Sequence, residues 1–296
     1  MKKFYLLFLI CIFFYSLQAQ VFIDETTNIN GVLYSNNQPV SGQVIDMYPT
    51  SKHHKLQATC KNGKWDGKYL EWFDNGNKKQ EGYYIGGQPD GLYTVWYDNG
   101  QICSTTNYKL GNKTGIYTEW YVDGKKKVEA NFNDGKRNGD YIFYDENGQM
   151  TKTITYKNDV SLKDCNYKNG HPDGIWEDWS ESGVKKSEIT YQDGIKISGI
   201  FYSNDESDWK QITYLENGKS HEIIFENKQK IGEGDLINDK PEGKWIYWID
   251  NGEKIKEQTY QNGELVKEET KITANLVSNF RSSPYSLLWL FIISSG

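Results

Sequence analysis

Hydrophobic and polar positions alternate along this chain in short runs that recur at a fixed spacing. A run of six or seven residues rich in aromatic and β-branched side chains, such as 67–73, is followed by an Asn-Gly or Asp-Gly step. A second, more polar run that ends in an aromatic residue and another glycine-containing turn complete the unit. Two alternating runs joined by a glycine turn predict a β-hairpin. No helix is predicted beyond the first nineteen residues, because no segment keeps an apolar period of 3.6.

The hairpin unit repeats every 24 residues. Weaker copies begin at Gly42 and Gly199, and the period breaks twice, which predicts irregular hairpins near 157–173 and 205–240. Because a single hairpin cannot bury its own face, we expect an all-β fold in which stacked hairpins form an elongated single-layer sheet. The glycines that mark the clear copies are Gly67, Gly76, Gly91, Gly100, Gly115, Gly124, Gly139, Gly148, Gly174 and Gly243.

The repeated glycines and aspartates have a backbone explanation. An Asn-Gly step fits a tight turn because both central residues need positive φ, which glycine allows and asparagine tolerates. Asp66, Asp90 and Asp173 each precede a unit glycine, and such a carboxylate can accept hydrogen bonds from nearby backbone N–H groups. No glycine cluster lies between a strand and a helix, so a phosphate-binding loop is not indicated.

The first nineteen residues are typical of a secretory signal peptide. Two lysines, an apolar stretch and Gln18-Ala19 occur in that order, and we expect cleavage after Ala19. The alternative, an uncleaved anchor, is disfavoured because the apolar stretch is shorter than the ~20 residues of a spanning helix. The protein is therefore expected to be exported, to the periplasm, the cell surface or the medium. Its mature chain should contain no integral membrane span.

The last segment, 266–296, does not resemble the repeats. Residues 287–293 form an apolar run far short of a bilayer span. The alternatives are a strand that closes the last repeat, an imperfect end of the reading frame, or membrane contact. The predicted organisation is a signal peptide (1–19), a lead-in or cap (20–41), the hairpin repeats (42–265) and this tail (266–296).

Composition and charge remove several classes of function. The 44 aromatic residues (22 Tyr, 12 Phe and 10 Trp) and 28 glycines favour strands and turns. Without Lys2 and Lys3, the 34 basic residues become 32 against 40 acidic ones, a net charge of −8. Acidic and basic residues are interspersed and form no basic stripe, so nucleic-acid binding is not expected.

Candidate chemistry is sparse. Cys60, Cys103 and Cys165 have no CxxC spacing, and their odd number allows at most one disulfide. The four histidines lie in different units, apart from an adjacent pair whose side chains diverge on a strand. We therefore expect no metal, no cofactor and no enzymatic activity, and no catalytic residue is assigned. The histidines are His53, His54, His171 and His221.

Aromatic residues are expected on both faces of the sheet. By the period of two, Tyr69 and Phe73 share one face while Leu70 and Trp72 share the other. If one face is less protected, its rings form a regular exposed ladder that can anchor a partner. The alternative is that both ladders pack only on their in-register neighbours. The candidate ladder consists of Trp72, Trp96, Trp120 and Tyr144.

The motif Gly-x-aromatic-x-x-aromatic-aromatic-x-Asn-Gly, followed by Tyr-x-x-Gly, resembles the MORN repeat, and more closely its bacterial variant in antitoxin-like repeat proteins. The similarity extends over residues 42–265. It implies a curved, single-layer sheet of hairpins and a protein-interaction scaffold, with membrane-lipid contact proposed for some members. The export signal distinguishes this chain from a cytoplasmic antitoxin. A weaker similarity, to the Trp- and Tyr-rich repeats that bind choline on cell walls, implies an aromatic cage for a quaternary ammonium.

Two classes of function follow, with a third behind them. The leading hypothesis is an exported, non-enzymatic scaffold that binds a protein along the ladder of tryptophans. The alternative is a cell-surface module that binds a carbohydrate or a lipid headgroup. Antitoxin-like neutralisation of a partner protein is the third.

Overall fold

The computed structural model describes residues 20–204 and 206–271, and the chain in this range is almost entirely β. The predicted signal peptide, 1–19, and the apolar run 287–293 lie outside the described residues. Contacts divide the chain into two units, one up to Lys136 and one from Arg137. Each unit is described by itself.

Among its described residues, 20–136, the first unit contains one short 3₁₀ turn, η1 (Ile23–Glu25), and thirteen strands. The strands are β1 (Gln20–Phe22), β2 (Thr27–Ile29), β3 (Val32–Ser35), β4 (Gln38–Pro39), β5 (Gly42–Met47), β6 (His54–Lys61), β7 (Lys64–Trp72), β8 (Lys78–Ile85), β9 (Gln88–Pro89), β10 (Gly91–Trp96), β11 (Ile102–Lys109), β12 (Asn112–Trp120) and β13 (Lys126–Asn133).

The part of the second unit that the structure describes, up to residue 271, also contains thirteen strands, the first of which begins one residue before the boundary. They are β14 (Lys136–Tyr144), β15 (Met150–Lys157), β16 (Val160–Lys168), β17 (His171–Pro172), β18 (Gly174–Trp179), β19 (Lys185–Gln192), β20 (Ile195–Tyr202), β21 (Trp209–Tyr214), β22 (Lys219–Glu226), β23 (Gln229–Ile237), β24 (Lys240–Trp248), β25 (Lys254–Gln261) and β26 (Glu264–Thr270).

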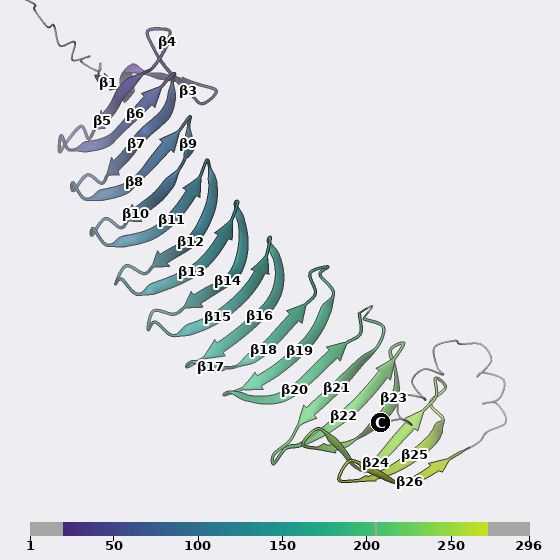
Figure 1. The fold of residues 1–296 in the computed structure, drawn as a ribbon. Coiled ribbons are helices and arrows are strands. Elements are labelled where there is room, and N and C mark those ends of the chain that lie inside the picture. Colours follow the sequence, from purple (N-terminus) through teal and green to yellow (C-terminus); the bar gives the residue numbers. More distant parts are fainter. Residues whose placement is uncertain (1–19, 205, 272–296) are drawn as a thin grey trace, which may run out of the picture. The chain divides into compact units, whose positions relative to one another are not determined.

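From β5 onward in the first unit, and throughout the described residues of the second, strands that follow one another along the chain pair antiparallel in a single layer. Figure 1 shows the successive hairpins side by side. The short strands β9 and β17 are bypassed, so that β8 pairs with β10 and β16 with β18. The stretches 157–173 and 205–240, where the sequence period breaks, contain strands of the same antiparallel ladder. The prediction of an all-β fold of stacked hairpins is confirmed.

Two kinds of turn join the strands. At Asn62-Gly63 both residues have positive φ, 50° and 75°, as expected for a two-residue hairpin. At Asn75-Gly76 only the glycine is left-handed, with φ of 86°, and its N–H donates to the carbonyl of Phe73 at 2.9 Å. The prediction that both central residues have positive φ is therefore wrong at this step. The bond from Gly76 to Phe73 and the left-handed glycine fit a type I turn followed by a glycine bulge, in which the asparagine needs no positive φ.

In three copies of the repeat, an aspartate couples the repeat to the turn that follows it. As the sequence predicts, these carboxylates accept backbone N–H groups, but the donors belong to the turn twenty residues further along the chain. Each bond thus closes a neighbouring turn instead of its own. The pairs are Asp66 with Gly86 at 3.1 Å, Asp90 with Leu110 at 2.9 Å and Asp173 with Asp193 at 3.2 Å.

One face of the sheet in the first unit is filled by tyrosine rings, and we call it the tyrosine face. Tyr69, Tyr84, Tyr93 and Tyr108 follow one another on it, with ring centroids 5.2, 6.3 and 6.0 Å apart. These separations are typical of aromatic pairs. Burial of Tyr69 and Tyr93 raises the pKa of both phenols above the usual value. The tyrosine face is thus the better protected side of this single layer.

Small residues make room for these rings. Gly82 lies beneath Tyr93, and a Cβ added there would come within 2.2 Å of the ring carbon Cδ2. The same repeat position holds Ala58 and Ala130, both buried. In the second unit a Cβ on Gly234 would lie 2.3 Å from the indole of Trp245. An aromatic ring over a small residue is therefore how a hairpin packs on its neighbour.

The N-terminal end of the first unit is built differently from the repeats. Strand β1 pairs in parallel with β5, and β2, β3 and β4 form a small sheet of their own. A cluster of buried residues lies between them and the repeats, with Val21, Ile23 and Trp65 packed against it. This end therefore has a local hydrophobic core. The cluster consists of Leu33, Val40, Val44 and Cys60.

The described residues were also searched for helical membrane spans. None of their helices has the length and apolar character needed to cross a bilayer.

Candidate partner-binding face

The face opposite the tyrosine face carries the predicted ladder in the first unit, and we call it the tryptophan face. Trp72, Trp96 and Trp120 end β7, β10 and β12, and the strand register shifts by one residue immediately before each of them. Such a bulge re-aims the side chain that follows it. The structure thus places three of the four predicted residues on one face of the first unit. Tyr144 ends β14, in the second unit, after the same shift.

The indoles are half-buried rather than fully exposed. The ring of His54 lies 5.7 Å from that of Trp72, at a tilt of 43°. The ammonium of Lys78 lies 5.4 Å from the ring centroid of Trp96, within the range of a cation–π contact. The first residue of a returning strand thus contacts the tryptophan of the following repeat. Removing an indole would therefore disturb the packing between repeats as well as the binding of a partner.

On the tryptophan face, three apolar side chains that the sequence analysis missed are at least half exposed. Tyr83 is 50% exposed, Leu92 58% and Ile116 60%. Leu92 and Ile116 lie four residues before Trp96 and Trp120, so the period of two places them on the same side of the sheet. That spacing is a sequence signal that could have identified Leu92 and Ile116. The prediction was restricted to the aromatic positions.

Ion pairs lie between these apolar positions. The carboxylate of Glu81 accepts hydrogen bonds from Lys78 at 2.6 Å and Lys68 at 2.9 Å, which lowers its pKa below the usual value. Lys126 and Glu129 form a similar pair at 2.5 Å. Exposed pairs of this kind add little stability. Together with the apolar side chains they give the mixed apolar and polar character of a protein interface.

The ten repeat glycines share a backbone conformation. All have positive φ, between 68° and 122°, where a residue with a Cβ is strained. Their role is therefore conformational. They are Gly67, Gly76, Gly91, Gly100, Gly115, Gly124, Gly139, Gly148, Gly174 and Gly243.

Groups that could carry other chemistry are dispersed. His221 is paired with Asp235, at 2.7 Å from Nδ1, and lies 3.6 Å from Glu233. Within residues 20–204 and 206–271 no three His, Cys, Asp or Glu side chains gather in a group that could hold a metal ion. The thiols at 60, 103 and 165 are free, and burial raises the pKa of Cys60 and Cys165 to about 11. Such thiols are poor nucleophiles at neutral pH.

Comparison with known families identifies the repeat. The family model of the MORN repeat variant matches residues 65–85, 89–110, 113–134, 137–158, 172–193 and 241–262. Six segments of the chain therefore match the MORN repeat variant. They coincide with the six clear 24-residue copies, and the weaker copies at Gly42 and Gly199 lie outside the matches. The prediction of MORN-variant repeats is thus confirmed, whereas the match says nothing of an antitoxin. A chain of such repeats is a repeat scaffold.

Other comparisons add no argument about function. No curated protein matches the chain. Among solved structures, a crystal structure of TcdB2-TccC3 without its hypervariable C-terminal region is 12% identical with a TM-score of 0.18. The alignment covers 79% of this chain and 18% of that one, so this chain spans less than a fifth of the matched protein.

Proposed function

We propose that the protein is an exported, non-enzymatic scaffold that binds a protein partner on the tryptophan face of its first unit. The observation that carries the proposal is the placement of Leu92 and Ile116, more than half exposed, beside half-buried indoles. An exposed apolar patch bordered by polar groups is typical of an interaction site. Export rests on the signal-peptide pattern of residues 1–19.

The difference between the two faces supports this choice. Ring contacts occupy the tyrosine face, so its side chains are already used in packing hairpin on hairpin. On the tryptophan face, Tyr83, Leu92 and Ile116 leave half or more of their surface to solvent. A partner would remove this apolar surface from water, which is favourable at roughly 25 cal/mol per Å².

The test replaces the exposed pair and leaves the indoles intact. Leu92→Lys with Ile116→Lys puts charges where a partner would bury apolar groups, and lysine already occupies the equivalent position, Lys68. The matched control is Leu110→Lys with Val122→Lys, since these side chains are 52% and 56% exposed but lie in turns. Circular dichroism should show both variants folded.

The full chain and the two variants are used as bait against an envelope extract of the source organism. We expect a protein retained by the parent chain and by the turn variant. The face variant should bind this protein about tenfold or more weakly, because truncated or charged interface anchors cost at least 1–2 kcal/mol. Equal retention by the face variant would remove the tryptophan face as the binding surface.

A further inference from the structure

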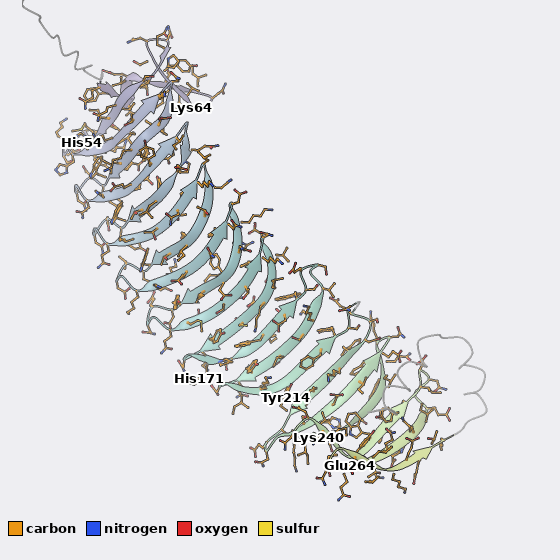
Figure 2. The ribbon with its side chains drawn as sticks, viewed as in Figure 1. His54, Lys64, His171, Tyr214, Lys240 and Glu264 are labelled. Atoms are coloured by element: carbon orange, nitrogen blue, oxygen red, sulfur yellow. The ribbon has the colours of Figure 1, made fainter. Side chains whose placement is uncertain are left out.

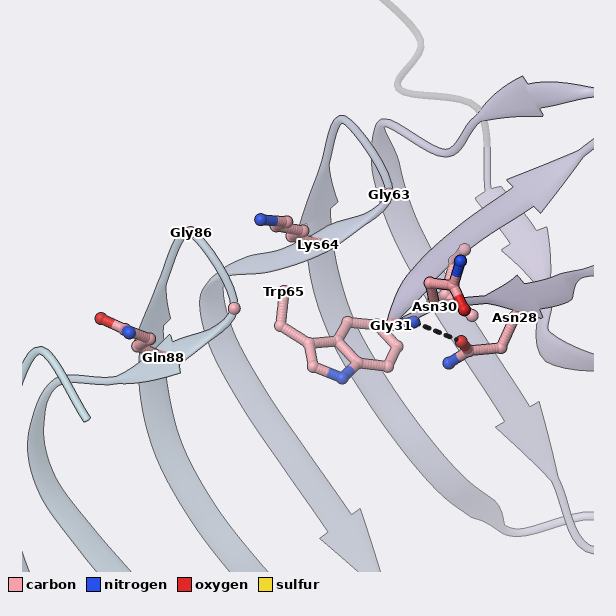
Figure 3. A pocket seen from close by; sticks show the side chains of 10 residues that line it. Asn28, Asn30, Gly31, Gly63, Lys64, Trp65, Gly86 and Gln88 are labelled. Atoms are coloured by element: carbon pink, nitrogen blue, oxygen red, sulfur yellow. Dashed lines mark hydrogen bonds between the residues drawn. The ribbon is translucent and has the colours of Figure 1, made fainter.

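A cavity of about 350 Å³ lies at the N-terminal end of the first unit, away from the exposed pair Leu92 and Ile116. It is open to solvent and is bordered by the β2–β3 turn on one side and by the turns β6–β7 and β8–β9 on the other (Figure 3). Figure 2 shows Lys64, at the β6–β7 turn, and His54 at opposite ends of the strands. The volume lies in the range of pockets that hold small molecules.

Trp65 supplies the aromatic wall of this cavity and departs from the repeat pattern. The equivalent position, two residues before the unit glycine, holds Pro89, Lys113, Pro172 and Pro241 in other copies. The indole packs edge-on against Tyr69, with centroids 5.6 Å apart at 72°, and also contacts the buried cluster near β3 and β5. Packing therefore holds the ring in place where it borders the cavity.

Amide groups supply the polar walls. The side-chain carbonyl of Asn28 accepts the N–H of Gly31 at 2.9 Å, which fixes this amide and leaves its NH₂ group as a donor. Asn30 and Gln88 contribute two further amides. Lys64 is the one charged residue among those that line the cavity, and no carboxylate is among them.

Glycines let the backbone approach the cavity closely. Gly63 has φ of 75°, and a Cβ there would lie 2.3 Å from Cγ1 of Val32 and 2.7 Å from the carbonyl oxygen of Leu33. Its N–H and carbonyl bond to Val40 and Leu33 at 2.7 and 2.8 Å. The β2–β3 hairpin can thus dock on the first repeat only because this residue has no side chain.

We propose that this cavity binds a neutral hexose unit of a glycan, stacked on Trp65. A pyranose has a flat face of C–H groups that suits an indole, and a rim of hydroxyls that both donate and accept, as amides do. A quaternary ammonium does not fit, since it needs several ring faces or a carboxylate and would meet Lys64. One lysine without other cationic groups is a poor site for phosphate.

The full chain is tested on an array of neutral mono- to tetrasaccharides, and the best sugar is titrated calorimetrically. Trp65→Leu keeps the apolar packing and removes the flat ring, and Gln88→Ala removes an exposed amide without touching the buried cluster. Asn112→Ala is the matched control, because Asn112 occupies the repeat position of Gln88 one copy further on, outside the cavity.

We expect saturable binding of at least one neutral sugar. Affinity should fall about tenfold in Trp65→Leu, a loss of about 1.4 kcal/mol, and measurably in Gln88→Ala. Asn112→Ala and the pair Leu92→Lys with Ile116→Lys should bind as the parent does, which separates this site from the proposed protein interface. Absence of saturable binding across the array would overturn the assignment. A sugar that binds Gln88→Ala and a folded Trp65→Leu with the same affinity as the parent chain would overturn it as well.

Discussion

The contact between Gly82 and Tyr93 can be tested by adding a single carbon. Gly82 has no positive φ that would strain an alanine, so Gly82→Ala changes only what lies above it. The new Cβ would lie 2.2 Å from Cδ2 and 2.5 Å from Cε2 of Tyr93, well inside contact distance. The ring or the strand must therefore move.

Two opposing effects set the magnitude. Alanine in a strand interior is favoured over glycine by about 0.5–1 kcal/mol, because glycine loses more conformational freedom on folding. Overfilling a packed site costs about 1–3 kcal/mol. The net expectation is a loss of about 1–2 kcal/mol, which corresponds to a decrease of roughly 0.5–1 M in the urea midpoint for a slope near 2 kcal/mol/M.

The assay is urea unfolding of the full chain followed by circular dichroism, with Gly82→Ala made in two backgrounds. In the parent chain it should lower the midpoint. In Tyr93→Leu, where the ring is gone, the same substitution should be neutral or stabilising, so that the two sites couple by more than about 1 kcal/mol. An equal shift in both backgrounds would refute the packing explanation.

Two further experiments test the hydrogen bonds between turns and the burial of the thiols. Asp90→Ala removes the acceptor 2.9 Å from the N–H of Leu110 and should cost about 1 kcal/mol in urea unfolding. Asp98→Ala should be silent, because its backbone carbonyl is the group that accepts hydrogen bonds from a neighbouring turn. Cys60 and Cys165 have pKa values raised to about 11 by burial. Only the unfolded state then releases these protons between pH 9 and 11, so stability should fall across this range, and Cys60→Ala with Cys165→Ala should reduce the fall. The same loss of stability with pH in that variant would show that the two buried thiols are not its cause.

The repeats could be predicted from the sequence because they rest on local rules. Glycine spacing with a 24-residue period and the alternation of apolar positions define the hairpins. The period of two along a strand places Tyr69 and Trp72 on opposite faces without any knowledge of long-range contacts. The predicted conformation of the turn at Asn75-Gly76 was wrong because the same dipeptide occurs in hairpin loops of two lengths. The residues on either side decide between them.

Contacts between hairpins could not be predicted from the sequence. The glycine beneath Tyr93 was not recognised, because the ring that fills its space belongs to the next repeat, eleven residues further on. Likewise, Trp65 differs from Pro89 and Lys113 at the same repeat position, but its meaning depends on a hairpin formed by β2 and β3. The exposed Leu92 was passed over because apolar residues on a strand are equally consistent with burial.

The hydrogen bonds from each aspartate to the following turn have a consequence for how such a protein changes over generations. Deleting residues 91–114, one full period, would join Asp90 to Gly115 and bring Asp134 to the place in the chain that Leu110 holds now. The same acceptor would again find a backbone donor twenty residues away. Copies can therefore be lost or duplicated without requiring a new kind of hydrogen bond. A single recombination event can thus change the number of repeats.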